Sequence, residues 1–162
     1  MISPATVAVC SEHLTYPAGV SDRYRLQRFV DAQDAGGTYT RAVQELRAGR
    51  KVSHWMWFVF PQIAGLGHSG ISREYAISGQ AEARAYLAHP VLGPRLIECA
   101  QILMANPGSS AVDIFGSVDA MKLRSSMTLF ASVAEPEEGV FRRVLDQFFG
   151  GLEDEATTSR LA

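Results

Sequence analysis

The sequence predicts an all-α fold, a single compact multihelical domain of about seven short helices. Apolar residues recur at three- and four-residue spacing in at least five segments, as in helices that bury one face. Glycine, proline or hydroxyl residues stand where most of these segments begin or end, which is typical of helix termini. No two strand-like runs are present that can pair with each other, and an isolated strand would leave its backbone unpaired.

Length and composition are those of an ordinary globular protein. The 162 residues suit one domain, which buries roughly 68–70% of the surface of its unfolded chain. With 47% hydrophobic residues and a net charge of −2, the chain has no general electrostatic reason to bind nucleic acid or an anionic membrane. No stretch approaches the roughly 18 apolar residues of a membrane span, and the N-terminus lacks a signal-peptide pattern. We therefore expect a cytoplasmic protein without nucleic-acid or membrane partners, and its oligomeric state stays open.

The chain divides into an N-terminal extension, residues 1–21, and a helical domain, residues 22–162. The extension carries scattered Pro, Ser, Thr and Gly without any period. The first helix is expected at the start of the domain and ends at residues 35–37, Ala-Gly-Gly. The second is expected at Thr38–Ala48, with Glu45 on its outward face.

An aromatic block follows at residues 54–62, and a glycine-rich segment follows it at residues 64–70. The block holds both tryptophans and two of the eight phenylalanines. Aromatic side chains bury on the order of 150–250 Å² each, so this stretch must lie inside the fold or against a partner. Its apolar run suits a buried strand or a buried helical turn, and we favour a helix or irregular turn. The block reads His54-Trp55-Met56-Trp57-Phe58-Val59-Phe60-Pro61-Gln62.

Helical patterns resume after an ambiguous stretch at residues 71–77. Ser78 offers an N-cap to a helix at Gln80–Ala88. Because proline is favoured in the first turn of a helix, the next helix is expected to begin at residues 89–90, His-Pro. The Asn-Pro-Gly sequence at residues 106–108 is expected to end it.

The next patterns are a short turn and a longer helix. Ser110 and Asp113 resemble a capping box, which opens the turn at residues 111–115. Ser117 then caps a helix that reaches about Ala134. Its buried face is expected to comprise Met121, Met127, Phe130 and Ala131.

The C-terminal part carries one more strong pattern. Proline and acidic residues at 135–138 are typical of a helix start, because acids favour the positive end of the helix dipole. Residues 150–151, Gly-Gly, end this helix. Residues 154–161 are expected to add one frayed turn.

Polar residues accompany strongly apolar context in two stretches, residues 53–69 and residues 122–130. In the second, three hydroxyl residues stand in the middle of a helix, where they compete with the backbone for hydrogen bonds. Two explanations stay open. Small residues allow close helix packing, or the hydroxyls and the planar guanidinium of Arg124 bind an anion or a ribose.

We expect one cavity to bring both stretches together, because burying so many polar groups separately would demand a partner for each. His54 is the candidate acid or base, since imidazole titrates near neutral pH, although a structural histidine is the more common case. Gln62 can bind an amide or a base edge through both a donor and an acceptor, and a purely structural role is an equal alternative. The expected ligand-binding residues are Trp57, Gln62, Lys122, Arg124 and Ser125.

Metal and cofactor chemistry are not expected. The four histidines, His13, His54, His68 and His89, show no metal-ligand spacing. The glycine-rich segment matches neither a P-loop nor a dinucleotide fingerprint. Cys10 and Cys99 form no disulfide framework, and Cys99 is expected to be a small buried apolar residue.

Several stretches resemble one bacterial family of unknown function, whose members are small, mostly helical proteins. The family is often labelled "calpastatin", but a calpain inhibitor is a long, polar, disordered repeat protein, which this chain does not resemble. The resemblance runs from about Arg25 to Phe149. It is carried by residues 26–33 (LQRFVDAQ), 45–51 (ELRAGRK), 54–62 (HWMWFVFPQ), 86–93 (YLAHPVLG) and 122–130 (KLRSSMTLF).

The order of elements is also similar to that of the NADAR family, helical proteins that cleave N-glycosidic bonds in ADP-ribose-type and riboflavin-pathway compounds. No residue-by-residue motif carries over, so this similarity assigns no catalytic residue. Together with the aromatic residues beside His54 and Gln62 and the helix that carries Arg124 and hydroxyl residues, it leads us to expect a site for a nucleotide or ADP-ribose-like small molecule, with N-glycosidase-type activity. The alternative is a non-enzymatic protein-interaction or regulatory module, in which exposed aromatic residues form a patch for a partner.

Overall fold

The computed structural model describes residues 22–162, and the predicted extension at residues 1–21 lies outside them. Within the described part the fold is all-α, as expected, with nine α-helices, two 3₁₀ turns and one β-bridge. The sequence predicted about seven helices, and the two additional ones are mainly the single-turn helices α3 (Met56–Val59) and α4 (Gly70–Glu74). The elements are α1 (Gln27–Asp34), η1 (Ala35–Gly37), α2 (Thr38–Arg47), α3 (Met56–Val59), α4 (Gly70–Glu74), α5 (Gln80–Ala88), α6 (Leu92–Met104), α7 (Ala111–Val133), η2 (Pro136–Glu138), α8 (Val140–Phe149) and α9 (Glu155–Leu161).

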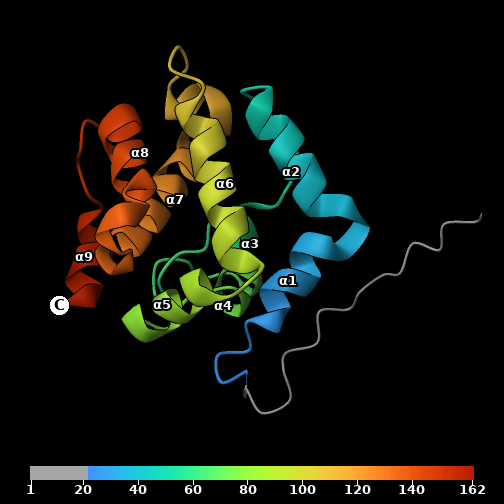
Figure 1. Cartoon of the computed structure of the whole chain (residues 1–162), viewed down its shortest axis with the longest axis vertical. Helices are drawn as coiled ribbons and strands as arrows, with labels where there is room; N and C mark the ends of the chain where they lie inside the picture. Colours follow the sequence, from blue (N-terminus) through green and yellow to red (C-terminus); the bar gives the residue numbers. More distant parts are fainter. Residues whose placement is uncertain (1–21) are drawn as a thin grey trace, which may run out of the picture.

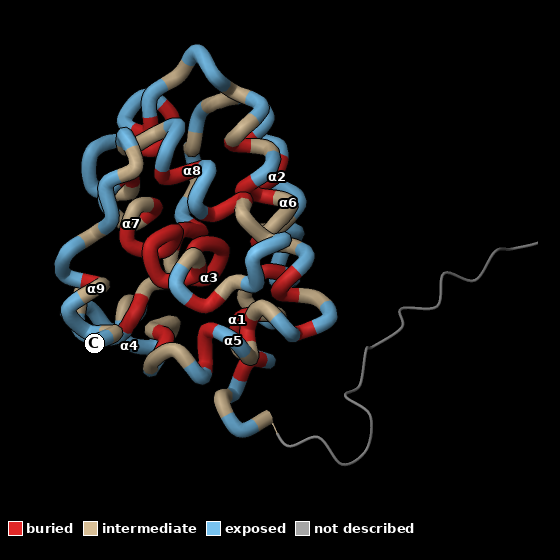
Figure 2. The backbone as a smooth tube through the Cα atoms, turned by 60° about the vertical axis from the view of Figure 1, so that its left-hand side comes forward, coloured by how far each residue is buried: buried red, intermediate tan, exposed pale blue. Residues whose placement is uncertain are grey.

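The longer helices pack around a central helix, α6. It contacts α2 on one side and α8 on the other, while α7 packs against α8, α5 and α9 (Figure 1). The short α3 passes through the middle of the molecule, where the chain is buried (Figure 2). None of the helices in residues 22–162 combines the length and apolar character of a bilayer-spanning segment.

The aromatic block supplies much of the core. Its short helix α3 agrees with the predicted helix or irregular turn. Trp55 and Phe60 are fully buried, and both rings pack against Phe115 of α7, with ring centroids 6.4 and 6.1 Å apart. Edge-on aromatic contacts of this kind add about 0.5–1.5 kcal/mol each to the gain from burial.

Glu45 does not face outward as expected. Its carboxylate accepts hydrogen bonds from the backbone N–H groups of Val52 and Ser53, from the Ser53 hydroxyl and from the Trp55 indole N–H. Helical periodicity missed this role because the donors come from the chain that returns after α2. Burial raises the pKa of Glu45, but the bonds from Ser53, Trp55 and Val52 outweigh burial and lower it below its usual value.

Two predicted helix starts need correction. Ser78 does not cap α5, because its backbone N–H donates to Glu82 Oε2 and Gly79 occupies the N-cap position. The next helix, α6, begins at Leu92 rather than at residues 89–90. Imidazole Nδ1 of His89 accepts the N–H groups of Val91 and Leu92, so the histidine side chain satisfies backbone donors at this helix start.

The turn expected at residues 111–115 and the helix expected from Ser117 are two parts of α7. The predicted capping box of Ser110 and Asp113 forms. Gly116 then takes φ 78° and ψ 167°, a backbone conformation that only glycine adopts readily, and this interrupts the helical geometry of α7.

The expected buried face of α7 is correct for Met127 and Phe130, which are fully buried, and wrong for Met121, which is 71% exposed. Ala131 is partly buried. Residues six apart on a helix differ by roughly a third of a turn, so Met121 and Met127 cannot share one face.

Candidate functional site

The polar residues of α7 bind the segment that leads into α9. Arg124 donates from Nε to the carbonyl of Leu152 at 2.9 Å and from Nη2 to the carbonyl of Glu153 at 2.6 Å. Ser125 donates from Oγ to Asp154 Oδ2 at 3.1 Å. We call this set of contacts the α7–α9 seam.

The seam explains most of the hydroxyl residues in the middle of α7. The Thr128 hydroxyl accepts the N–H of Asp154, and Asp154 in turn caps α9 by accepting from Thr157. The hydroxyl of Ser126 is buried and has no hydrogen-bond partner within residues 22–162, which fits a small residue chosen for close packing. Ser126 is therefore an example of the close-packing explanation. Arg124, Ser125 and Thr128 bind protein groups instead, and the explanation by anion or ribose binding stays a prediction.

Lys122 and Trp57 join the two stretches that the sequence singled out. The Lys122 Nζ lies 4.7 Å from the centroid of the Trp57 ring and 3.4 Å from Asp119 Oδ1. The other Asp119 oxygen pairs with Lys51, whose Nζ is 3.0 Å away. One carboxylate thus lies between two lysines beside the indole, which leaves this part of the surface with a positive balance.

A surface pocket opens beside Trp57, with a volume of about 140 Å³. Its wall is made by the end of the aromatic block, the glycine-rich segment and α4. The lining residues are Trp57, Gln62, Ile63, Ala64, Gly65, Gly67, Ser72, Arg73, Tyr75 and Ala76.

Backbone hydrogen bonds hold the two sides of the pocket together. The N–H of Ile77 donates to the carbonyl of Gln62, and the N–H of Ala64 donates to the carbonyl of Ile77, each at 2.8 Å. On the other side of the loop, Arg160 of α9 donates from Nη2 to the carbonyl of Gly65 at 3.2 Å. The α7–α9 seam therefore supports the pocket indirectly, because it positions the helix that carries Arg160.

Arg28 fixes the wall that carries Tyr75. Its guanidinium donates to the carbonyls of Glu74 and Ala76, at 2.8 and 3.0 Å, and forms an ion pair with Glu82 at 2.9 Å. The Tyr75 ring packs on Phe29 and Phe58 from behind. The tyrosine is thus positioned by buried neighbours and not by solvent-exposed loops.

Four lining side chains carry polar groups that have no hydrogen-bond partner within residues 22–162. They are the indole N–H of Trp57, the amide of Gln62, the guanidinium of Arg73 and the hydroxyl of Tyr75. Arg73 is exposed, while the other three are partly buried. Two aromatic rings, an amide and a free guanidinium around one hollow are a recurrent composition for small-molecule sites.

Of the six predicted site residues, two line this pocket and the other four do not. Trp57 and Gln62 line the pocket, and Lys122 reaches it only through its contact with the Trp57 ring. His54 is exposed and is not among the lining residues. Arg124 and Ser125 form the α7–α9 seam, and their role in ligand binding stays a prediction.

Arg73 and Tyr75 are pocket residues that the sequence did not single out. They lie in the stretch at residues 71–77, whose pattern was ambiguous. The signal that points to them is the glycine-rich segment directly after the aromatic block. Gly67 approaches α4 so closely that a Cβ there would lie 2.6 Å from the Cβ of Ser72.

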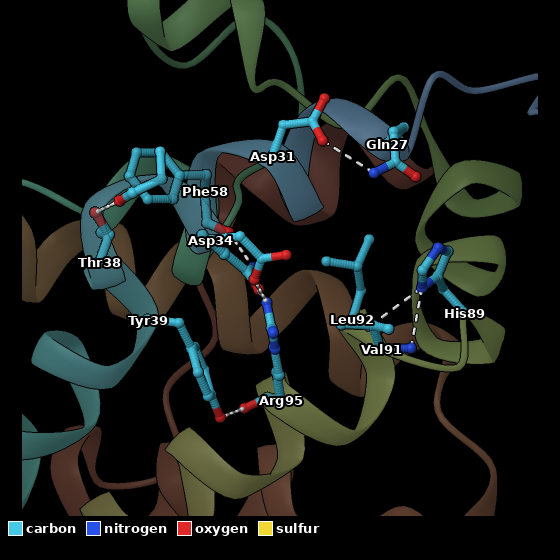
Figure 3. A network of polar contacts seen from close by, with 12 residues as sticks. Gln27, Asp31, Asp34, Thr38, Tyr39, Phe58, His89, Val91, Leu92 and Arg95 are labelled. Atoms are coloured by element: carbon cyan, nitrogen blue, oxygen red, sulfur yellow. Dashed lines mark hydrogen bonds and ion pairs between the residues drawn. The ribbon is translucent and has the colours of Figure 1, made fainter. Parts of the chain in front are cut away.

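In a second polar network, between α1 and α6, the polar side chains are paired with each other (Figure 3). Arg95 of α6 donates to the side chains of Gln33 and Asp34, at 3.1 and 2.9 Å. Tyr39 donates from its hydroxyl to Glu98 at 2.6 Å, and its pKa is raised by burial first and by nearby acidic groups second. Every group of this network has a partner, so we interpret it as architecture.

Cys99 is fully buried, as the sequence predicted. Burial raises the pKa of its thiol to about 12, so the residue stays protonated at neutral pH. Within residues 22–162 no group of three or more His, Cys, Asp or Glu side chains is arranged to hold a metal ion.

The fold and the pocket define a small all-α domain with one candidate ligand site. Residues 23–161 match the family described as "Protein of unknown function (DUF1810)", and the chain belongs to that family. It is 48% identical to the conserved hypothetical protein Rv1873 from Mycobacterium tuberculosis, whose crystal structure aligns with a TM-score of 0.83 over 86% of this chain and 98% of that chain. No curated protein matches the chain. The resemblance to a family of unknown function is thus confirmed.

Proposed function

We propose that this protein binds a small anionic molecule with an aromatic ring, of the nucleotide or ADP-ribose-like class, in the pocket beside Trp57. The observation that carries the proposal is that four residues lining one hollow have polar side-chain groups without a hydrogen-bond partner within residues 22–162. Partly buried polar groups normally find partners within the protein, so the three partly buried groups of Trp57, Gln62 and Tyr75 favour a ligand as the missing partner. The indole ring offers a stacking surface, and Arg73 offers charge to a phosphate or carboxylate.

The N-glycosidase-type activity has less support than the binding. Hydrolysis of a glycosidic bond needs a general acid or a base that activates water. Of the described residues that line the pocket, none carries a carboxylate or an imidazole, and His54 is outside the lining. We therefore propose binding as the primary function and keep hydrolysis as a property to be assayed with each ligand that binds.

A thermal-shift screen with NAD, ADP-ribose and common nucleotides tests the proposal. A ligand present at about 100 times its dissociation constant adds roughly 2.7 kcal/mol to the unfolding free energy, which raises the melting temperature visibly. Trp57→Leu should remove the response, while Val118→Leu, at an exposed site on α7, should keep it. A panel without any response would contradict the proposal.

One observation favours the alternative, a protein-interaction module. Val118 and Met121 are 66% and 71% exposed and lie three residues apart on α7, so they form a small apolar strip on one helix face. In that case binding of a partner would depend on this strip and not on the pocket. Glutamate at both positions should then abolish partner binding and leave the thermal response to nucleotides unchanged.

A further inference from the structure

The size of the pocket beside Trp57 restricts the part of a ligand that can enter it. Its volume of about 140 Å³ is close to that of an engineered cavity of about 150 Å³ that holds benzene. Sites that enclose a whole drug-sized ligand measure about 300–1,000 Å³. A single six-membered ring therefore fits inside, and any larger remainder of the ligand must lie outside at the rim.

The polar groups in the pocket restrict the chemistry of that ring. The amide of Gln62 presents an acceptor and two donors side by side, which complements a ring edge with adjacent C=O and N–H groups. The Trp57 N–H and the Tyr75 hydroxyl can donate to further ring oxygens. Such an imide edge is present in uracil-type pyrimidines.

The charge of the pocket favours a neutral ligand ring over a cationic one. Of the described residues lining the pocket, Arg73 alone carries a formal charge, and Lys122 lies against the Trp57 ring. None of the described residues that line the pocket is a carboxylate that could balance a positive ring, so a positively charged pyridinium ring is disfavoured there. A neutral ring with an anionic substituent satisfies both the amide and the guanidinium.

The number of free guanidinium groups restricts the anionic part. Arg160, next to the same glycine-rich segment, already donates to the carbonyls of Gly65 and Ala156. Arg73 is exposed, has no partner within residues 22–162 and can bind one phosphate through two N–H groups. Among the described residues that line the pocket, the single guanidinium of Arg73 matches one phosphate group.

We infer that the preferred ligand is a pyrimidine nucleoside monophosphate of the uracil type, with the ring in the pocket and the phosphate on Arg73. This inference rests on the proposed function, because it names the ligand class of the same pocket. Purine nucleotides should bind more weakly, because their two fused rings are larger than the pocket volume. Dinucleotides should gain no affinity from their second half, because that half would make no contact in the pocket.

Isothermal titration calorimetry with four probes tests the inference: uridine monophosphate, uridine, adenosine monophosphate and ADP-ribose. We expect uridine monophosphate to bind at least tenfold more tightly than each of the others. Arg73→Ala should reduce the affinity for uridine monophosphate to that for uridine, and Gln62→Leu should weaken both at least tenfold. The matched controls are Arg143→Ala and Gln147→Leu, whose side chains are exposed and have no partners within residues 22–162, and they should bind as the native protein does.

The outcomes separate this inference from the proposed function. Equal or tighter binding of adenosine monophosphate or ADP-ribose would overturn the pyrimidine class and leave the pocket as a nucleotide site. Equal binding of uridine and its monophosphate would overturn the role of Arg73 and hence the phosphate. Absence of binding by all four probes, in a protein that melts cooperatively, would overturn the inference and contradict the nucleotide class of the proposed function.

Discussion

The α7–α9 seam and the pocket beside Trp57 are built from the same kinds of side chains. Each contains an arginine and side chains with hydroxyl groups, and each lies next to a loop segment. In the seam, the guanidinium of Arg124 and the hydroxyls of Ser125 and Thr128 all bind protein groups. In the pocket, the guanidinium of Arg73 and the hydroxyl of Tyr75 bind no protein group within residues 22–162. Residue type alone therefore does not distinguish the structural seam from the proposed ligand site. The two differ in that the guanidinium of the seam is hydrogen-bonded to the protein and that of the pocket is not, within residues 22–162.

The largest effect should come from Arg28, the most completely paired arginine behind the pocket. Arg28→Ala leaves Glu82 as a buried carboxylate, only 4% exposed at its side chain, without its cation. Breaking a buried pair in this way costs about 3–5 kcal/mol. Urea denaturation should show a loss of this size, and the control Arg143→Ala should change stability by less than about 0.5 kcal/mol. A loss below about 1 kcal/mol for Arg28→Ala would show that the pair does not hold the pocket wall.

A smaller effect with a distinctive pH dependence is expected for Glu45→Gln. Glutamine removes the negative charge of the carboxylate, which accepts four hydrogen bonds. Hydrogen bonds to charged groups contribute about 1.5–3 kcal/mol to the free energy of unfolding. The pKa of Glu45 is lowered in the folded state, so its stabilising effect is complete above the unfolded pKa and is lost as pH falls through the folded pKa. The difference in unfolding free energy between native protein and variant should thus be full above about pH 5 and shrink in stronger acid. A difference that stays constant into strong acid would exclude the charge as its origin.

Arg124→Ala addresses the seam directly. It removes two bonds to backbone carbonyls at a partly exposed site, so we expect a loss of about 1–2 kcal/mol, below the value for a buried ion pair. Hydrogen exchange should show that amides of α9 lose protection while those of α6 keep it. If Arg124 instead binds the anion of a ligand, the variant would keep the stability of the native protein and lose only the thermal response to that ligand.

The fold was largely accessible from the sequence, because helical spacing and end signals are local. The capping box of Ser110 and the burial of Cys99 were predicted for this reason. The seam was not, since the partners of Ser125 and Thr128 lie 26–29 residues later in the chain. Two pocket residues, Trp57 and Gln62, were named because they stand in the distinctive aromatic block. Arg73 was missed because exposed arginines are common and only the three-dimensional structure shows that this one lines the pocket.

The smallest effect on stability, and the sharpest contrast with the seam, is expected for Arg73→Ala. The side chain is exposed and has no hydrogen bond or ion pair within residues 22–162. Surface substitutions of this kind usually change the unfolding free energy by less than about 0.5 kcal/mol. Urea denaturation of the ligand-free variant should therefore be indistinguishable from that of the native protein, whereas Arg28→Ala and Arg124→Ala should both shift the midpoint. An arginine that contributes nothing to folding and yet is required for the thermal response to a nucleotide acts on the ligand itself. A loss of 2 kcal/mol or more in the ligand-free variant, on the order of a buried hydrogen-bonded charge, would instead place Arg73 with the structural arginines.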